Sequence, residues 1–319
     1  MSEKPILIVD GLSLFIRQFV ANPSMNTKGE AAGGIVGFLG SLQWLVGQLS
    51  PKMVIVVWEG GGSRRRRAIF PEYKEKRRPQ KLNRYYENDI PNTIDNRNHQ
   101  VSTIVALLKN VSITQMYVED CEADDVIGYL CRRKFPSDKK IILSSDKDFY
   151  QLIDEHTKVY SPNSKLFMGP TEVLEKFQIT PRNFCLAKAV CGDPSDNIPG
   201  IEGVGFKTFA KRFQEIGTES DVTIAEIIEK ANENRTKKKA PKIYNQIVEG
   251  ESIIRRNWSL MYLDTVNLSA SQIKKIDNTI DKFEPKRDKM GLLREVMKEG
   301  LITFDADRFF FTLSYLMNS

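Results

Sequence analysis

The first half of the chain alternates short apolar runs with longer segments in which apolar residues recur every three or four positions. The short runs have the length of buried strands and lie at Pro5–Val9, Met53–Trp58, Ile113–Val118 and Lys140–Leu143. The longer segments have helical periodicity and lie at Ile35–Leu49, His99–Lys109 and Ala123–Lys134. This alternation predicts an α/β fold in which helices cover a mostly parallel sheet.

The second half of the chain has the pattern of an all-helical region. A helix is predicted to begin near Pro170, because proline suits the first turn of a helix. Further helical patterns lie at Pro181–Val190, Val204–Phe213, Thr223–Lys230, Lys242–Val248 and Ser252–Leu263. The polar and basic segment Ala231–Pro241 is predicted to be a loop, and the residues from Ser269 onward carry helical patches without a usable motif.

These patterns divide the chain into three parts. We expect an α/β core at residues 1–168, an all-helical domain at residues 169–268 and a C-terminal helical extension of unknown role at residues 269–319. A length of 319 residues, of which 41% are hydrophobic, is enough for one good core and a second small domain.

The sequence argues against a membrane-spanning or secreted protein and against a zinc site. The longest purely apolar run, Met53–Trp58, is far too short to span a bilayer, and no charged-then-apolar signal precedes the first strand. We therefore expect a soluble, cytoplasmic protein with no membrane partner. The four cysteines include no C-x-x-C pair and the two histidines lack metal-ligand spacing, which argues against a zinc site.

The positive charge is concentrated in one segment. The chain has a net charge of +6, but residues 64–84 alone carry ten Lys or Arg and two Glu. A basic patch on an otherwise slightly acidic body suggests a polyanionic partner, most commonly nucleic acid. Taken alone, an arginine run is more often a solvated loop.

Acidic residues follow directly after predicted strands or occupy polar turns. Nine of them form the candidate set: Asp10, Glu59, Glu122, Asp124, Asp125, Asp146, Asp148, Asp193 and Asp196. Each motif by itself is better explained as a helix cap or a turn. In parallel sheets, however, ligands bind beyond the carboxyl ends of the strands, so these acids are expected to converge.

Converging carboxylates require a counter-charge. So many like charges cannot all stay ionised without one, and hard divalent cations with oxygen ligands supply it. Magnesium is the default ion, with manganese as a substitute. Two such ions about 4 Å apart form the usual two-metal arrangement for phosphodiester cleavage.

Six motifs occur together in one order. They are ILIVDG at Ile6–Gly11, the cations from Tyr73-Lys74 to Arg77, CEADDVIG at Cys121–Gly128, SDKD at Ser145–Asp148, GDPSDNIPG at Gly192–Gly200 and GVGFKT at Gly203–Thr208. In order and spacing, over roughly residues 5 to 215, the chain resembles the 5′-nuclease family. That family includes bacteriophage flap endonucleases, 5′→3′ exonucleases and the 5′-nuclease domain of bacterial DNA polymerases.

The resemblance implies a fold and an activity. The fold is a PIN-like α/β core with a helical arch at about residues 62–98, followed by a helix–three-turn–helix module. The activity is magnesium-dependent cleavage near 5′ ends, with a 5′ flap, a nick or a 5′ end of duplex DNA as substrate and an RNA–DNA hybrid as a further candidate. A monomer in a bacterial or phage-infected cell is expected, and a replication protein is an unidentified candidate partner.

The resemblance also assigns roles to the acids. It implies that Asp10, Glu122, Asp124 and Asp125 serve the metal nearer the nucleophile. It implies that Asp146, Asp148, Asp193 and Asp196 serve the second metal. Which acid binds directly and which through water is left open.

The basic residues receive roles from the same resemblance. Lys74 and Arg77 are implied to hold the scissile phosphate, and together with Asp146 they form the expected catalytic group. Expected DNA contacts are Arg17, Arg64, Arg65, Arg66, Arg67, Tyr73, Lys74, Arg77, Gly203, Gly205, Lys207, Thr208 and Lys211. A potassium ion is a candidate ligand of the Gly200–Thr208 turn.

One position departs from the family pattern. The family usually has Asp after its second strand, where this chain has Glu59. The extra methylene allows an outer-sphere contact or a shifted metal, while the simpler interpretation is an acid at a strand end.

Two other functions compete with nuclease activity. A DNA-binding protein with the same fold and lost catalysis has no use for repulsive carboxylates beside DNA, so the second acidic group argues against it. A PIN-type ribonuclease toxin would lack the arch and the helical module.

Overall fold

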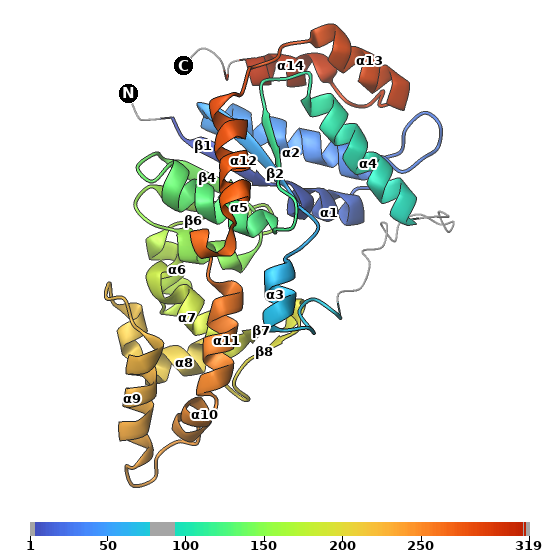
Figure 1. Ribbon diagram of the computed structural model, residues 1–319. Coiled ribbons are helices and arrows are strands. Elements are labelled where there is room, and N and C mark those ends of the chain that lie inside the picture. Colours follow the sequence, from blue (N-terminus) through green and yellow to red (C-terminus); the bar gives the residue numbers. More distant parts are fainter. Residues whose placement is uncertain (1–3, 77–92, 315, 317–319) are drawn as a thin grey trace.

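A computed structural model of the chain describes residues 4–76, 93–314 and 316. Its centre is a six-stranded sheet with the order β3-β2-β1-β4-β5-β6 (Figure 1). The strands are β1 (Ile6–Asp10), β2 (Met53–Trp58), β3 (Thr114–Tyr117), β4 (Lys140–Leu143), β5 (Thr157–Ser161) and β6 (Leu166–Met168). The first five strands pair in parallel and β6 pairs antiparallel with β5. The predicted α/β class is therefore confirmed.

Helices cover both faces of the sheet because the strand side chains alternate between the faces. Leu7 and Val9 share a core with α1 (Gly11–Ala21), α2 (Gly33–Leu49) and α4 (Thr93–Leu108). Ile6 and Ile8 pack on the other face, against α5 (Ala123–Tyr129) and the 3₁₀ helix η2 (Lys147–Leu152). Strands buried on both faces read as continuous apolar runs, as these strands do.

The helical domain lies below the sheet in Figure 1. It consists of α6 (Pro170–Phe177), α7 (Pro181–Cys191), α8 (Phe206–Arg212), α9 (Ile224–Arg235), α10 (Ile243–Glu249) and α11 (Glu251–Met261). A short antiparallel pair, β7 (Gly192–Asp193) with β8 (Ile198–Pro199), joins α7 to the turn before α8. The apolar residues of the helical domain belong to the same core as Ile6 and Ile8 of β1. Buried packing therefore joins the helical domain to the sheet.

The C-terminal extension returns to the α/β core. It forms α12 (Ala270–Asp281), α13 (Lys289–Glu299) and α14 (Ala306–Ser314). Leu292 and Phe309 are fully buried in the cluster that contains α2 and α4. Helices α13 and α14 therefore complete the helical layer over this face of the sheet, while Ile276 and Ile280 of α12 belong to the core on the other face (Figure 1).

The sequence-based predictions missed or misplaced four elements. Helix α1 and strands β5 and β6 were not predicted, and α9 continues to Arg235 through the first part of the segment expected to be a loop. Of the predicted arch, the structure describes the short helix α3 (Arg64–Ile69), a turn to residue 76 and the start of α4. Arg77 lies outside the described residues. Within them, no helix is both long enough and apolar enough to cross a bilayer.

Candidate active site

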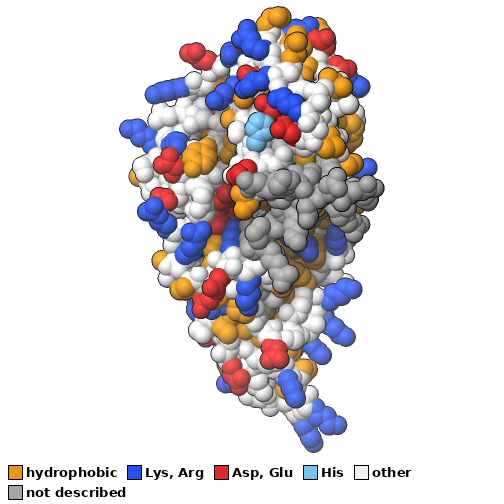
Figure 2. All heavy atoms as spheres, turned by 90° about the vertical axis from the view of Figure 1, so that its right-hand side faces the viewer, with side chains coloured by type: hydrophobic (Ala, Val, Ile, Leu, Met, Phe, Trp, Pro, Cys, Tyr) orange, Lys and Arg blue, Asp and Glu red, His pale blue; other side chains and the backbone are white. Residues whose placement is uncertain are grey.

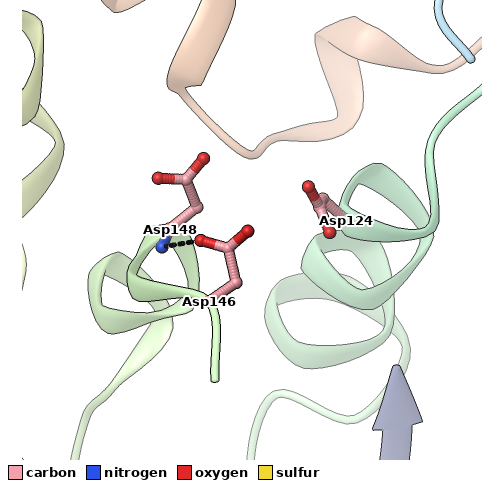
Figure 3. A group of neighbouring side chains, drawn as sticks. All are labelled: Asp124, Asp146 and Asp148. Carbon is pink, nitrogen blue, oxygen red and sulfur yellow. Dashed lines mark hydrogen bonds between the residues drawn. The ribbon is translucent and has the colours of Figure 1, made fainter. Parts of the chain in front are cut away.

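Three aspartates meet beyond the carboxyl ends of the central strands. One carboxylate oxygen from each of Asp124, Asp146 and Asp148 lies within 4.8 Å of the other two (Figure 3). Asp124 comes from the first turn of α5, and the other two come from the start of η2. Asp146 is fixed there because its Oδ1 accepts a hydrogen bond from the backbone N–H of Asp148 at 2.8 Å. A set of oxygen donors of this kind fits a hard divalent cation.

Asp10 borders this cluster at the end of β1. Its carboxylate accepts hydrogen bonds from the Ser13 backbone N–H at 3.1 Å and from Ser144 Oγ at 3.0 Å. Burial raises the pKa of Asp10 from its usual 3.8 to about 6, and the nearby charge of Asp146 adds to the increase. Burial and the charge of Asp146 also raise the pKa of Asp124 well above its usual value. The positive charges near Asp10 and Asp124 therefore do not fully compensate the negative charge of the cluster.

Glu59 occupies the position where the family usually has Asp. Its carboxylate accepts hydrogen bonds from the backbone N–H groups of Gly62 at 3.1 Å and Ala123 at 3.4 Å. Burial and the charge of Glu122 raise its pKa. The longer side chain therefore connects the loop before α3 with the first residue of α5, and its predicted contact with a metal stays a prediction.

Glu122, which precedes α5, is held by three side chains from the segment before residue 77. It lies 2.8 Å from Lys74 Nζ and 3.3 Å from an Arg66 nitrogen, and it accepts a hydrogen bond from the Tyr73 hydroxyl at 2.8 Å. Burial would raise the pKa of Glu122, but Lys74 and Arg66 outweigh it and lower that pKa. Lys74 also lies 3.8 Å from Asp196, so its ammonium sits between two predicted metal ligands.

Lys188 is a site residue that the sequence analysis missed. It projects from α7, is 4% exposed, and pairs with both Asp148 and Asp193, the latter at 2.7 Å. Burial opposes ionisation of Asp193, but Lys188 outweighs it and lowers the pKa of that carboxyl. The available signal was a lysine in an otherwise apolar helical stretch, five residues before Asp193.

Arg66 and Asp125 form a buried ion pair at the start of α5. Arg66 is 2% exposed, and its guanidinium holds the Asp125 carboxylate through two hydrogen bonds of 2.6 and 2.7 Å. A guanidinium enclosed in this way offers no face to a phosphate, which argues against the predicted DNA contact of Arg66. Both oxygens of Asp125 accept hydrogen bonds from Arg66, so Arg66 competes with a metal ion for this carboxylate, and the role of Asp125 as a metal ligand stays a prediction.

Tyr73 also departs from its predicted role. Its ring is 5% exposed and packs with Ile198, Leu260 and Met261, which leaves no face for stacking on a base. The burial of Tyr73 argues against its predicted DNA contact. Burial and the charge of Glu122 raise its pKa far above the usual value, so the hydroxyl stays a neutral donor.

The remaining cations of the segment divide between two faces of α3. Arg64 is exposed and pairs with Asp120 at 3.0 Å, and Arg67 is exposed as well. Arg65 instead donates to Asn267 Oδ1 at 2.6 Å and to the Ser259 carbonyl. Arg64 and Arg67 are therefore better placed for a DNA strand than Arg65, whose predicted contact stays untested.

The predicted DNA-binding turn of the helical domain is exposed. Gly203 adopts a φ of 72°, which favours glycine, and Gly205 caps α8. Lys207 and Thr208 are exposed in the first turn of α8, and Lys211 is exposed in its last turn. Figure 2 shows further Lys and Arg side chains along the helical domain down to its tip. Arg17, on α1, donates to Asn163 Oδ1 at 2.8 Å and lies on the surface, apart from this turn.

The sequence matches a known family over more than half of its length. Residues 5–178 match the family described as the 5′-3′ exonuclease, N-terminal resolvase-like domain. The chain belongs to this 5′-3′ exonuclease family. The matched range contains the carboxylates of the Asp124 cluster, Asp10 and Lys74, and the resemblance drawn from the sequence motifs is confirmed.

Two relatives of the exonuclease family differ in architecture. The chain is 37% identical over 215 residues to the DNA polymerase I of Deinococcus radiodurans, which covers 67% of this chain and 21% of that protein. It is 32% identical over 221 residues to the 5′-3′ exonuclease of Aquifex aeolicus, which covers 69% of this chain and 72% of that protein. The chain thus spans about a fifth of the polymerase and most of the exonuclease.

Two solved structures share the fold of this chain. Bacteriophage T5 5′-exonuclease with bound zinc has a TM-score of 0.69 at 21% identity, over 88% of this chain and 98% of that chain. The catalytic core of Rad2 in complex with a DNA substrate has a TM-score of 0.54 at 15% identity, over 99% and 93% of the two chains. The predicted PIN-like fold is therefore confirmed.

Stability of the metal-free protein is expected to fall as the pH rises through 6. The folded state favours protonated Asp10, whose pKa is about 6 instead of 3.8, so its contribution is present below pH 4 and lost above pH 6. This difference corresponds to at most about 3 kcal/mol. Thermal unfolding in chelator from pH 4 to 8 measures it.

Asp10→Asn is the matched variant for this pH series. Asparagine retains the helix cap of α1 but does not titrate. The variant should lose less stability than the natural protein between pH 4 and pH 7. Equal slopes for the two proteins would show that Asp10 titrates normally in the folded state.

Proposed function

We propose that this member of the exonuclease family is a structure-selective 5′ nuclease that hydrolyses phosphodiester bonds near the 5′ ends of branched or nicked DNA. The observation that carries the proposal is the Asp124–Asp146–Asp148 cluster beside the ammonium of Lys74. Carboxylates that hold divalent cations and a cation that binds phosphate are the two components that phosphodiester hydrolysis requires.

The carboxylates assign the metal-holding residues. Asp124, Asp146 and Asp148 would hold a divalent cation, for which magnesium is the proposed ion and manganese a substitute. Asp10 lies beside them and is expected to ionise when a cation binds. The bound cations would activate water and stabilise the charge of the leaving oxygen.

Lys74 is placed to hold the scissile phosphate. Its side chain is 18% exposed and its ammonium lies between Glu122 and Asp196 at the edge of the acidic site. Its backbone has a φ of 58°, an unusual value for a residue with a side chain, and such values concentrate at functional sites. Arg77, three residues further on, is proposed as its partner from the family motif.

The helical domain would bind the duplex beside the site. Exposed Lys207 and Thr208 follow a glycine turn at a helix N-terminus and exposed Lys211 lies on the same short helix, an arrangement suited to phosphate contacts without sequence readout. A potassium ion in the Gly200–Thr208 turn belongs to the same proposal. The proposed substrates are a 5′ flap, a nick or a 5′ end, with an RNA–DNA hybrid as a further substrate and a cytoplasmic monomer as the working form.

A cleavage assay tests the proposal. The protein is incubated with a 5′-flap duplex, a nicked duplex, a blunt duplex and an RNA–DNA hybrid, each with magnesium and with chelator. We expect magnesium-dependent cleavage near the 5′ end, fastest on the flap or nick. Tight binding without cleavage of any substrate would instead support a DNA-binding protein that has lost catalysis.

Lys74→Met should reduce the cleavage rate on a 5′-flap duplex by about 10²- to 10³-fold, because a fixed cation that stabilises transition-state charge contributes that much. Single-turnover rates at saturating enzyme measure the effect. Lys76→Met, two residues further and exposed, is the matched control and should reduce the rate far less. Equal rates for Lys74→Met and the natural protein would remove Lys74 from the catalytic group.

A further inference from the structure

The four-arginine run of α3 contains one buried cation with contacts to three parts of the fold. Besides Asp125, the Arg66 guanidinium donates to the Leu260 carbonyl at 2.7 Å and to Glu122 at 3.3 Å. Glu122 and Asp125 flank Asp124 at the start of α5, and Leu260 lies in the last turn of α11. One side chain thus connects α3, the carboxylate-bearing helix and the end of the helical domain.

The contacts of Asp125 extend this connection. Its Oδ1 also accepts a hydrogen bond from Asn267 Nδ2 at 3.1 Å, and its Oδ2 faces the Glu122 backbone N–H at 3.4 Å. Arg65, the neighbour of Arg66, donates to the same Asn267. Hydrogen bonds from the side chains of Arg66 and Asn267, and not packing alone, therefore fix the start of α5.

We propose that Arg66 is a positioning residue for the metal site, which sets the carboxylates of α5 through Glu122 and Asp125 and does not contact DNA. This inference rests on the proposed nuclease function, since it concerns the same carboxylates. The position of Asp124 depends on the first turn of α5, and Arg66 holds the residues on both sides of Asp124. Groups that orient metal ligands in this way typically change metal affinity 10- to 100-fold when they are removed.

A guanidinium is suited to this place in a way that an ammonium is not. Its planar fork meets both oxygens of Asp125 while a third nitrogen reaches the Leu260 carbonyl. Lysine at the same position would keep the charge but could not make the paired contact. Arg66→Lys is therefore the variant that separates geometry from charge.

The first test separates positioning from phosphate contact. DNA binding is measured in chelator at several salt concentrations for Arg66→Lys, Arg66→Met and Arg64→Ala. Each lost phosphate contact reduces the slope of log K against log salt by about 0.9. We expect an unchanged slope for both Arg66 variants. A slope reduced by about 0.9 in the Arg66 variants would mean that Arg66 binds phosphate and would overturn the proposal.

The second test measures metal binding directly. Manganese titrated calorimetrically into DNA-free protein should bind 10- to 100-fold more weakly to Arg66→Lys than to the natural protein. Arg308→Lys, on the exposed surface of α14, is the matched control and should bind manganese normally. Thermal unfolding shows whether each variant is folded. If Arg66→Met does not fold, the result for Arg66→Lys decides the test. Unchanged manganese affinity in folded Arg66→Lys would overturn the proposal.

These measurements do not depend on cleavage. If the flap assay fails while manganese affinity falls as expected, the proposed nuclease function is wrong but the role of Arg66 at the metal site stands. If cleavage occurs and manganese affinity is unchanged in the variant, the nuclease function stands and the role of Arg66 is wrong.

Discussion

Asp146→Asn is expected to reduce metal-dependent cleavage of a 5′-flap duplex by at least about a thousand-fold. Metal ions stabilise the transition state of such reactions by several kcal/mol, and about 4 kcal/mol corresponds to a factor of a thousand. The charge of Asp146 adds to the effect of burial in raising the pKa of both Asp10 and Asp124, so Asp146 interacts with both carboxylates. Replacing its charge by an amide therefore weakens the whole cluster.

The substitution is designed to leave the fold intact. Asp146 caps η2 by accepting the Asp148 backbone N–H, and asparagine can make the same bond. The thermal midpoint in chelator should therefore stay the same or rise, because one of several repelling charges is removed. Loss of cleavage together with a strongly lowered midpoint would point to misfolding instead.

Asp307→Asn is the matched control. Asp307 is exposed on α14 and pairs only with a surface lysine in the described structure, a type of ion pair that contributes little. It should cleave at the natural rate. Single-turnover cleavage with magnesium and with manganese measures both variants, and natural rates for Asp146→Asn would remove this residue from the metal site.

The sequence predicted where the acidic site lies in the fold better than it predicted which side chains hold the acids in place. Asp10, Asp146 and Asp148 follow apolar strands, and the carboxyl ends of parallel strands necessarily meet at one edge of the sheet. Position after a strand is a local property, so it is readable from the pattern. Burial of Arg66 is not, because it depends on which face of α3 packs against α5 and α11.

Helix α1 shows a signal that was present but overlooked. Leu14, Phe15 and Phe19 are buried at helical spacing, and Asp10 supplies the cap. Gly11 is required because a Cβ there would lie 2.8 Å from the Trp58 ring. The helix begins at a glycine because the indole leaves no space for a side chain.

The packing of the C-terminal extension could not be predicted in the same way. Helices α13 and α14 are amphipathic, which predicts a buried face but not the partner of that face. The partners are α4 and α2, about 190 and 270 residues earlier in the chain. Contacts at such separation leave no periodic signal in a single sequence.

Lys188→Met is expected to reduce the free energy of unfolding in chelator by about 3–5 kcal/mol, the range for removing one partner of a buried ion pair. Its ammonium pairs with Asp148 and Asp193, so the variant would leave two carboxylates facing each other. A divalent cation can compensate the same charges. We therefore expect magnesium to stabilise the variant more than the natural protein, as urea unfolding with magnesium and with chelator would measure.

Lys140→Met is the matched control because Lys140 is equally buried but its ammonium binds the backbone carbonyls of Phe135, Pro136 and Asp138. Lys140→Met should be less stable than the natural protein. Magnesium should stabilise this variant no more than it stabilises the natural protein. If magnesium restores both variants alike, the recovery is unspecific. If magnesium restores only Lys188→Met, the ammonium of Lys188 and a divalent cation neutralise the same carboxylates. Lys188 then stabilises the folded arrangement of Asp148 and Asp193 until a metal ion binds.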